Sequence, residues 1–408
     1  MIKGKLVALL GGICLAVVLV APLFTVACAK PAPAGPIKIG MLMPLSGPHA
    51  IWGERFTEVT EFTLDEINHE VAGRPIEAII EDEGGEDISV ALEKTKKLIE
   101  ADKVDIIMGP FYVGSRIAVY PYTSSIPVPV VSGLSAAVAE AENEYVIWMQ
   151  PSYIDSQRPL GEYAYDKLGI RTVTTIGADY SYAYDYIQGF TDAFQERGGK
   201  VVQQQWAPLT ETDYTPYLAS LKEADALVSS CSYPTAQLAF FSQFKELGLH
   251  EKMRIFQAEQ SAIPESVMEE IGDSIIGTTS CLTYHYSADN ALSRRWVAAF
   301  EAKYGRKPDA MDMMWYEAMI VTFIALEAME GDTEPTKLME ALLKRVLDTP
   351  TAHIRFRADG MPVKRGYITE VQKVNGKLTW VILDRPEMAP KVYRGSGYKK
   401  FEDRESAS

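Results

Sequence analysis

The stretch Thr172–Trp206, TVTTIGADYSYAYDYIQGFTDAFQERGGKVVQQQW, contains a complete strand–helix–strand unit. It predicts a strand over 172–176, a helix over 184–197 that ends at Gly198-Gly199, and a second strand over 201–206. Parallel strands need a long crossover connection of this kind, usually a helix. This part of the chain is therefore predicted to form an α/β fold with a parallel sheet.

Predicted strands and helices alternate in this way in two series. In the first series, which also has a helix over 51–70, the predicted strands lie at 37–43, 76–81, 104–108, 128–131 and 145–149. In the second, which opens after Pro151, they lie at 172–176, 201–206, 226–230, 254–258 and 277–282. Predicted helices at 293–304, 312–329 and 335–346 follow, then a strand near Ile354 and a hairpin of 367–374 with 378–383, turning at Asn375-Gly376. The pattern predicts two doubly wound α/β halves.

The N-terminal residues read as a targeting segment. Lys3 and Lys5 precede the apolar stretch 6–27, which predicts a signal peptide over residues 1–27. That stretch is long enough to span a bilayer, so an uncleaved anchor is the alternative. The sequence Thr25-Val26-Ala27-Cys28 resembles a bacterial lipoprotein box, which implies a lipid on Cys28, and simple cleavage near Ala27 is the other possibility. Residues 28–36 would then form a Pro/Ala-rich tether. Lipidation at Cys28 and simple cleavage near Ala27 both imply that the protein is exported.

Composition narrows the class of partner. The chain has 408 residues, with 40 Lys and Arg against 55 Asp and Glu, for a net charge of −15. Removal of residues 1–27, which hold two Lys and no acid, brings the charge to −17. Phosphate backbones and anionic membranes bind basic clusters, so neither nucleic acid nor an anionic membrane surface is an expected partner.

The chain carries no motif for catalysis, for a metal or for a cofactor. It has no Gly-x-Ser-x-Gly, His-Glu-x-x-His, Cys-x-x-Cys or phosphate-loop pattern, and its five histidines are scattered. The acidic run Glu81-Asp82-Glu83 lacks the spacing of a cation loop and is predicted to be a solvated turn. The sequence therefore predicts neither an enzyme nor a cofactor.

Aromatic and small polar residues gather at the carboxyl ends of the predicted strands. In open α/β sheets ligands bind at these ends, and pockets for small molecules combine apolar walls with a few polar groups. The candidate ligand-binding residues at these ends include Ser46, Trp52, Tyr112, Leu134, Ser135, Tyr182, Ser232, Tyr233 and Glu259.

Cys231 and Cys281 are the cysteines of the predicted folded body. Double winding places their strands about two spacings of ~4.8 Å apart, whereas a disulfide needs Cα atoms within ~7 Å. Both are therefore predicted to be free thiols.

The segments IKIGMLMPLSGPHAIWG (37–53), VDIIMGP (104–110), VPVVSGLSA (128–136) and FRADGMPVKRGY (356–367), with the 172–206 unit, resemble the periplasmic substrate-binding proteins of branched-chain amino acid ABC importers. The resemblance covers nearly the whole chain after the tether. It implies two Rossmann-like lobes that close on a ligand and are joined by three crossovers, near Gln150, Tyr284 and Met361. The N-terminal lobe would comprise 37–150 plus 285–361, and the C-terminal lobe 151–284 plus 362–400.

The resemblance also assigns roles to residues. Trp52 and Tyr182 stand at aromatic positions of the family's site, and Glu259 at the carboxylate that pairs with the ligand's ammonium group. Val113 and Ala136 depart from the pattern, because the amino acid binders carry Ser and Thr there. Backbone N–H groups after Pro110 and Ser135 can still bind an anion. An amide, an aromatic compound or an amine therefore stays open as the ligand.

The resemblance implies a receptor without catalytic activity. It would bind an amino acid or an amino-acid-like small molecule between its lobes and deliver it to a membrane permease, as a monomer in the periplasm or at the cell surface. A ligand sensor of the same fold for amides, aromatic compounds or amines, acting through a partner protein, is the alternative. A hydrolase in the cleft is disfavoured, because no nucleophile motif occurs.

Overall fold

The computed structural model describes residues 35–388 except 48, 86, 138–142, 232–233, 262 and 352. The predicted signal peptide, Cys28 and most of the tether lie outside these residues. Among the described helices, none is long and apolar enough to cross a membrane.

A six-stranded sheet, ordered β2-β3-β1-β4-β5-β6, is the centre of the first lobe. Its strands are β1 Ile37–Met43, β2 Glu70–Val71, β3 Arg74–Asp82, β4 Ile106–Met108, β5 Val130–Ser135 and β6 Val146–Gln150. All neighbours are parallel except the short β2 against β3. Their side chains are almost entirely buried in β1, β4, β5 and β6, which explains why these strands read as continuous apolar runs.

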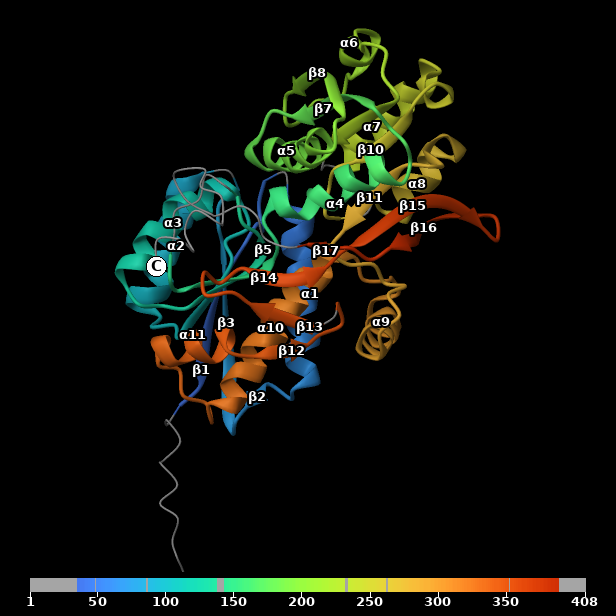
Figure 1. Ribbon diagram of the computed structural model, residues 1–408. Helices are drawn as coiled ribbons and strands as arrows, with labels where there is room; N and C mark the ends of the chain where they lie inside the picture. The colour runs from blue at the N-terminus through green and yellow to red at the C-terminus, as the bar shows by residue number, and fades with distance from the viewer. Residues whose placement is uncertain are drawn as a thin grey trace, which may run out of the picture. The chain divides into compact units, whose positions relative to one another are not determined.

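Helices from two distant parts of the sequence cover this sheet. They are α1 Ala50–Glu66, α2 Ile88–Lys96, the π-helical turn η1 Lys97–Ala101, α3 Val113–Ser125, α9 Ala291–Tyr304, α10 Ala310–Ala328 and α11 Pro335–Leu343. Figure 1 shows α1 and α10 side by side although they are far apart in sequence. Helix α1 ends earlier than the predicted 51–70, because Asn68 and His69 take positive φ angles and turn the chain into β2.

The second lobe is built on a seven-stranded sheet, ordered β16-β15-β11-β10-β9-β7-β8. Its strands are β7 Thr172–Ala178, β8 Lys200–Ala207, β9 Ala226–Ser230, β10 Arg254–Gln257, β11 Thr279–Leu282, β15 Tyr367–Val374 and β16 Lys377–Asp384. Strands β7 to β11 pair in parallel, and β15 and β16 form the predicted antiparallel hairpin. Asn375 (φ 52°) and Gly376 (φ 82°) both have positive φ, as a type I′ turn requires.

The helices of this lobe are α4 Tyr153–Asp166, α5 Ser181–Glu196, α6 Thr215–Ala219, α7 Pro234–Glu246 and α8 Glu265–Ile271, with 3₁₀ turns η2 Leu249–Glu251 and η3 Asp273–Ile275. Helices α4 and α5 cross at short range, and a glycine of each helix lies at the crossing. A Cβ on Gly161 would lie 2.2 Å from the carbonyl oxygen of Phe190, and one on Gly189 would lie 2.1 Å from that of Ile154. Only glycine allows the two backbones to approach this far. The short helices α6 and α8 were not predicted from the sequence.

The chain passes between the lobes three times, after β6, after β11 and between β14 and β15. A four-stranded sheet lies at the last passage, ordered β12-β13-β14-β17 and made of β12 Val346–Asp348, β13 His353–Phe356, β14 Pro362–Arg365 and β17 Glu387–Met388. Only the strand near Ile354 was predicted from the sequence. Two parallel-sheet lobes joined by three crossovers confirm the predicted fold class.

Cys231 and Cys281 are both buried and free, as predicted. Strand β10 lies between β9, which Cys231 follows, and β11, which contains Cys281. The predicted separation by an intervening strand is thus the physical reason that no disulfide forms.

Candidate functional site

A pocket is walled by residues of both lobes at the carboxyl ends of the two parallel sheets. The first lobe contributes side chains from the start of α1, from the loop before α3, from β5 and from α10, namely His49, Trp52, Phe111, Tyr112, Val113, Leu134 and Met311. The second contributes the start of α4, the first turns of α5 and the loop after β10, namely Tyr153, Tyr180, Tyr182, Tyr186, Glu259, Gln260 and Ser261. A molecule in this pocket would touch both lobes.

Aromatic rings form most of the wall. On the second-lobe side, the Tyr153 ring lies 4.9 Å from that of Tyr186 and 6.5 Å from that of Tyr182, measured between centroids. On the first-lobe side, His49 lies 5.0 Å from both Phe111 and Tyr112. Burial lowers the pKa of His49 to about 4, so that its imidazole is neutral at pH 7. Such walls suit an apolar body or a cation, which the faces of aromatic rings attract.

Glu259 supplies a negative charge to this pocket. It follows β10, its side chain is only 2% exposed, and its Oε1 accepts a hydrogen bond from the Ser230 hydroxyl at 2.9 Å. Burial first, and then the charge of Glu259, raises the pKa of Tyr186 above its usual value. Among the described residues that line the pocket there is no Lys or Arg. The polar chemistry of the pocket is therefore that of a carboxylate among aromatic rings.

The neighbouring residue Gln260 joins the two lobes at the edge of the pocket. Its Oε1 accepts a hydrogen bond of 2.5 Å from the Ser135 hydroxyl at the end of β5. Its Nε2 lies 3.6 Å from the sulfur of Met314 on α10. Ser135 thus binds the second lobe itself.

A second buried carboxylate lies behind the first-lobe wall. Glu83, which follows β3, is fully buried, whereas the sequence predicted a solvated turn, so that this prediction is wrong for Glu83. Its two oxygens accept hydrogen bonds from the backbone N–H groups of Phe111 (2.9 Å) and Tyr112 (3.2 Å). Burial raises the pKa of Glu83 to about 7, against the lowering effect of these hydrogen bonds. The N–H groups of Phe111 and Tyr112, which lie between Pro110 and the first residue of α3, are therefore bound by the protein itself.

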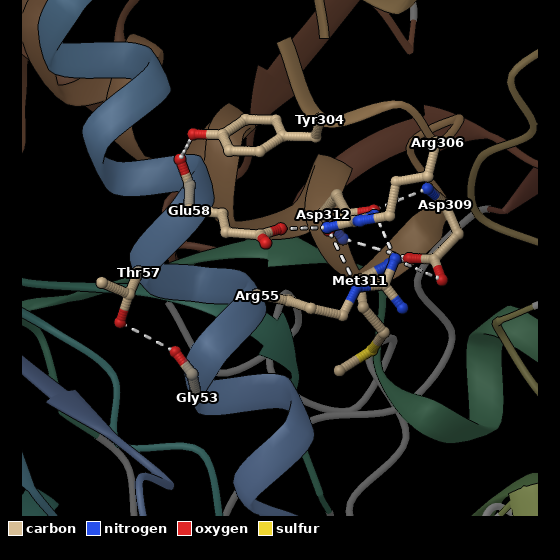
Figure 2. A network of polar contacts seen from close by, with 9 residues as sticks. All are labelled: Gly53, Arg55, Thr57, Glu58, Tyr304, Arg306, Asp309, Met311 and Asp312. Carbon is tan, nitrogen blue, oxygen red and sulfur yellow. Dashed lines mark hydrogen bonds and ion pairs between the residues drawn. The ribbon is translucent and has the colours of Figure 1, made fainter. Parts of the chain in front are cut away.

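A network of ion pairs joins helix α1 to the start of helix α10 in the first lobe (Figure 2). The Arg55 guanidinium contacts Asp312 at 2.5 Å and Asp309 at 2.8 Å, and Arg306 contacts Asp312 at 2.8 Å. Arg306 also reaches Glu58 on α1 at 2.7 Å. These contacts link α1 to the first turn of α10.

The same network supports two residues of the pocket wall. The Arg55 guanidinium lies 4.9 Å from the ring centroid of Trp52, and Met311 lies between the two network aspartates in sequence. The network thus contacts the ring of Trp52 directly, and its Asp309 accepts the backbone N–H of Met311 at 2.9 Å.

A model of the family described as periplasmic binding protein matches residues 36–377. The chain belongs to the periplasmic binding protein family. Members of this family are solute-binding receptors of ABC transporters, and membership makes this an exported protein.

Individual relatives are distant but match over most of their length. The Leu/Ile/Val-binding protein homolog 6 of Brucella suis is 22% identical over 354 residues, which are 85% of this chain and 90% of the relative. The ABC transporter substrate-binding protein from Sphaerobacter thermophilus is 28% identical, with a TM-score of 0.81 over 86% of this chain and 98% of its own. The solute binding protein of an ABC transporter from Rhodopseudomonas palustris BisB5, solved in complex with 3,4-dihydroxy benzoic acid, is 24% identical, with a TM-score of 0.76 over 86% of this chain and 97% of its own.

The structure brings many of the predicted ligand-binding residues of this periplasmic binding protein to one pocket. Those that line it are Trp52, Tyr112, Val113, Leu134, Tyr182 and Glu259. Ser46 is exposed on the loop after β1, and Ser135 and Ala136 are buried without lining the pocket. Ser232 and Tyr233 lie outside the described residues.

Several residues of the wall were not predicted from the sequence. They are His49, Phe111, Tyr153, Tyr180, Tyr186, Gln260, Ser261 and Met311. Tyr186 could have been found as the residue one helical turn after Tyr182, and Tyr153 as the first residue of the helix after the first crossover. No cluster of His, Cys, Asp and Glu that could hold a metal ion occurs among the residues that the structure describes.

Proposed function

We propose that this protein binds a small molecule with an ammonium group between its lobes and delivers it to an ABC permease. The observation that carries the proposal is the buried carboxylate of Glu259 in a pocket whose described lining has aromatic rings and no Lys or Arg. A carboxylate in the wall of a water-excluded pocket strongly attracts a cation that enters it, because screening there is weak. An ammonium group of the ligand would meet Glu259 and, at the same time, the faces of the surrounding rings.

The aromatic walls support a ligand with an apolar or aromatic body. The Brucella suis relative is named for leucine, isoleucine and valine, and the Rhodopseudomonas palustris protein was solved with an aromatic acid. An aromatic acid fits this pocket less well than an ammonium compound, because its carboxylate would meet Glu259 without a cationic side chain among the described lining residues. An amino acid or a related amine is therefore the proposed class.

Binding would act by closing the two lobes without catalysis. We place the lobes at 37–150 plus 285–361 and at 151–284 plus 362–400, with the crossovers as hinges. Because Trp52 belongs to one wall and Glu259 to the other, a ligand that touches both would favour the closed form. We further propose that residues 1–27 are a signal peptide, that a lipid on Cys28 anchors the monomeric receptor, and that residues 28–36 are its tether.

The test is a thermal-shift screen of the mature protein with amino acids, amines, amides and aromatic acids. A ligand at about 100 times its Kd stabilises the folded protein by about 2.7 kcal/mol, which raises Tm by several degrees. We expect ammonium compounds to raise Tm in the wild type and in Glu246→Gln, an exposed control on α7, but not in Glu259→Gln. If only compounds without an ammonium group raise Tm, and Glu259→Gln binds them equally well, the proposed ligand class is wrong.

A further inference from the structure

Glu83 is a buried anion that binds the backbone just before α3. Its oxygens accept the N–H groups of Phe111 (2.9 Å) and Tyr112 (3.2 Å), directly before α3. Backbone N–H groups at the start of a helix lack partners within the helix and attract anions. Here a side chain of the protein itself, with no exposed surface, is the anion at this place.

Phe111 and Tyr112 both line the pocket, so the Glu83 carboxylate lies behind its first-lobe wall. Glu259 stands in the second-lobe wall. The pocket is therefore bracketed by two buried carboxylates, one contributed by each lobe. Carboxylates repel each other strongly where water is excluded, because screening there is weak.

One buried cation lies close to this arrangement. The Arg116 guanidinium donates to the carbonyl oxygens of Phe111 (2.7 Å) and Ser135 (3.2 Å) and to the Tyr153 hydroxyl (3.3 Å). Its charge favours the ionised form of Glu83, and it is not part of the pocket lining. Arg116 thus favours the charged form of Glu83, and Glu259 is the one Asp, Glu, Lys or Arg side chain among the described residues that line the pocket.

We propose that Glu83 makes the receptor select organic amines, which carry an ammonium group and no carboxylate, over the corresponding α-amino acids. The inference rests on the proposed function, because it assumes that Glu259 binds the ammonium group. An amine would match the pocket's negative charge and leave the Glu83 contacts intact. The carboxylate of an amino acid would find the N–H groups of Phe111 and Tyr112 already bound and a like charge behind them.

The test compares ligand pairs that differ only in the carboxylate. Isothermal titration calorimetry at pH 8 would measure the Kd of leucine against 3-methylbutylamine and of phenylalanine against phenethylamine. For the wild type we expect each amine to bind roughly 30-fold or more tightly than its amino acid, the size of effect seen when a buried charge is left unpaired. We expect Glu83→Gln, which removes the charge, to bring this ratio down about tenfold or more.

Glu81→Gln is the matched control, because Glu81 lies two residues before Glu83, on β3, but pairs with Lys94 and Lys97 at the surface. It should keep the wild-type ratio. If Glu83→Gln does not fold, the ratio of the Kd of the amino acid to that of the amine, measured on the wild type, tests the proposed preference for amines. Equal binding of amine and amino acid by the wild type, or an unchanged ratio in folded Glu83→Gln, would overturn the role of Glu83 while the proposed function stands. If no ammonium compound of any kind binds, the proposed function itself fails.

Discussion

The buried ion pair of Lys364 and Glu317 offers the sharpest test of the structure. Neither side chain has exposed surface. The Lys364 ammonium, on β14, donates to Glu317 Oε2 (2.9 Å), Gln150 Oε1 (3.1 Å) and the Met149 carbonyl oxygen (3.3 Å), so that its three N–H groups have three acceptors. The pair joins α10 to the segments of the first and third crossovers.

The change Lys364→Met removes the charge while keeping a long apolar side chain. Glu317 would keep the hydroxyl hydrogen bonds of Thr349 (2.6 Å) and Thr351 (2.5 Å) but lose its ion pair with Lys364. Removing one partner of a buried ion pair destabilises a protein by about 3 to 5 kcal/mol. Glu317→Gln should cost a similar amount, because it leaves the ammonium group buried.

The double variant Lys364→Met/Glu317→Gln contains neither charge. Its loss of stability should fall short of the sum of the single losses by about 2 kcal/mol or more, since each single variant includes the cost of the other's uncompensated charge. Urea unfolding followed by tryptophan fluorescence measures these free energies of unfolding. As a control, Lys344→Met removes an exposed helical pair with Glu340 and should cost about 0.5 kcal/mol or less. A loss below 1 kcal/mol for Lys364→Met, or simple additivity in the double variant, would refute the reasoning.

Further predictions concern a carboxyl group, a glycine and the thiols. Burial raises the pKa of Glu83 from 4.5 to about 7, so the unfolded state loses this proton at a lower pH than the folded state does. Ionisation of Glu83 should therefore lower the free energy of unfolding as pH rises from about 4.5 to 7, by up to about 3 kcal/mol. The free energy of unfolding of Glu83→Gln minus that of the wild type should therefore increase over this range in urea titrations, and a flat difference would contradict it. Gly189→Ala would bring a Cβ within 2.1 Å of the Ile154 oxygen and should lower stability by about 1 to 3 kcal/mol, whereas a gain, as expected from helix preference alone, would argue against the close crossing. Burial raises the pKa of Cys231 to about 12 and also raises that of Cys281, so neither thiol should react with a disulfide reagent at pH 8 until the protein is unfolded, and fast labelling of the folded protein would contradict their burial.

The alternation of strands and helices was predictable because buried parallel strands are short apolar runs and their crossover helices are amphipathic. Predicted and observed bounds agree for β1, β9 and β15. The short elements α6, α8, β12, β14 and β17 escaped prediction, since a few residues cannot show a period. Helix α5 begins at Ser181 rather than at 184, because Asp179 and Tyr180 already form the turn that starts it.

The candidate site was predictable only in part. Glu259 follows β10, and Trp52 lies at the start of α1 after β1, so both are near the carboxyl ends of strands, where the topology alone places ligands. Tyr153 comes from the helix after a crossover, and its place opposite Tyr186 depends on the close crossing of α4 and α5. Glu83 was predicted to lie in a solvated acidic turn, because the backbone N–H groups that it binds, those of Phe111 and Tyr112, are far away in the sequence. Contacts between distant segments leave no local pattern in a sequence.

Several buried charges of this protein lie at the pocket and at the crossovers, and their positions suggest why they are present. Glu259 and Glu83 bracket the pocket, the Arg55 and Asp312 pair stands behind Trp52, and Lys364 joins the first and third crossover segments. Apolar side chains of similar volume often stabilise a fold as well as a buried ion pair or better, so stability alone does not explain these groups. Each of them instead contacts a part of the pocket or of a crossover: the backbone behind a wall, the ring of Trp52 or the end of β6. Their positions at the pocket and at the crossovers therefore favour a role in shaping the site, while the apolar sheets of the two lobes supply most of the buried apolar surface.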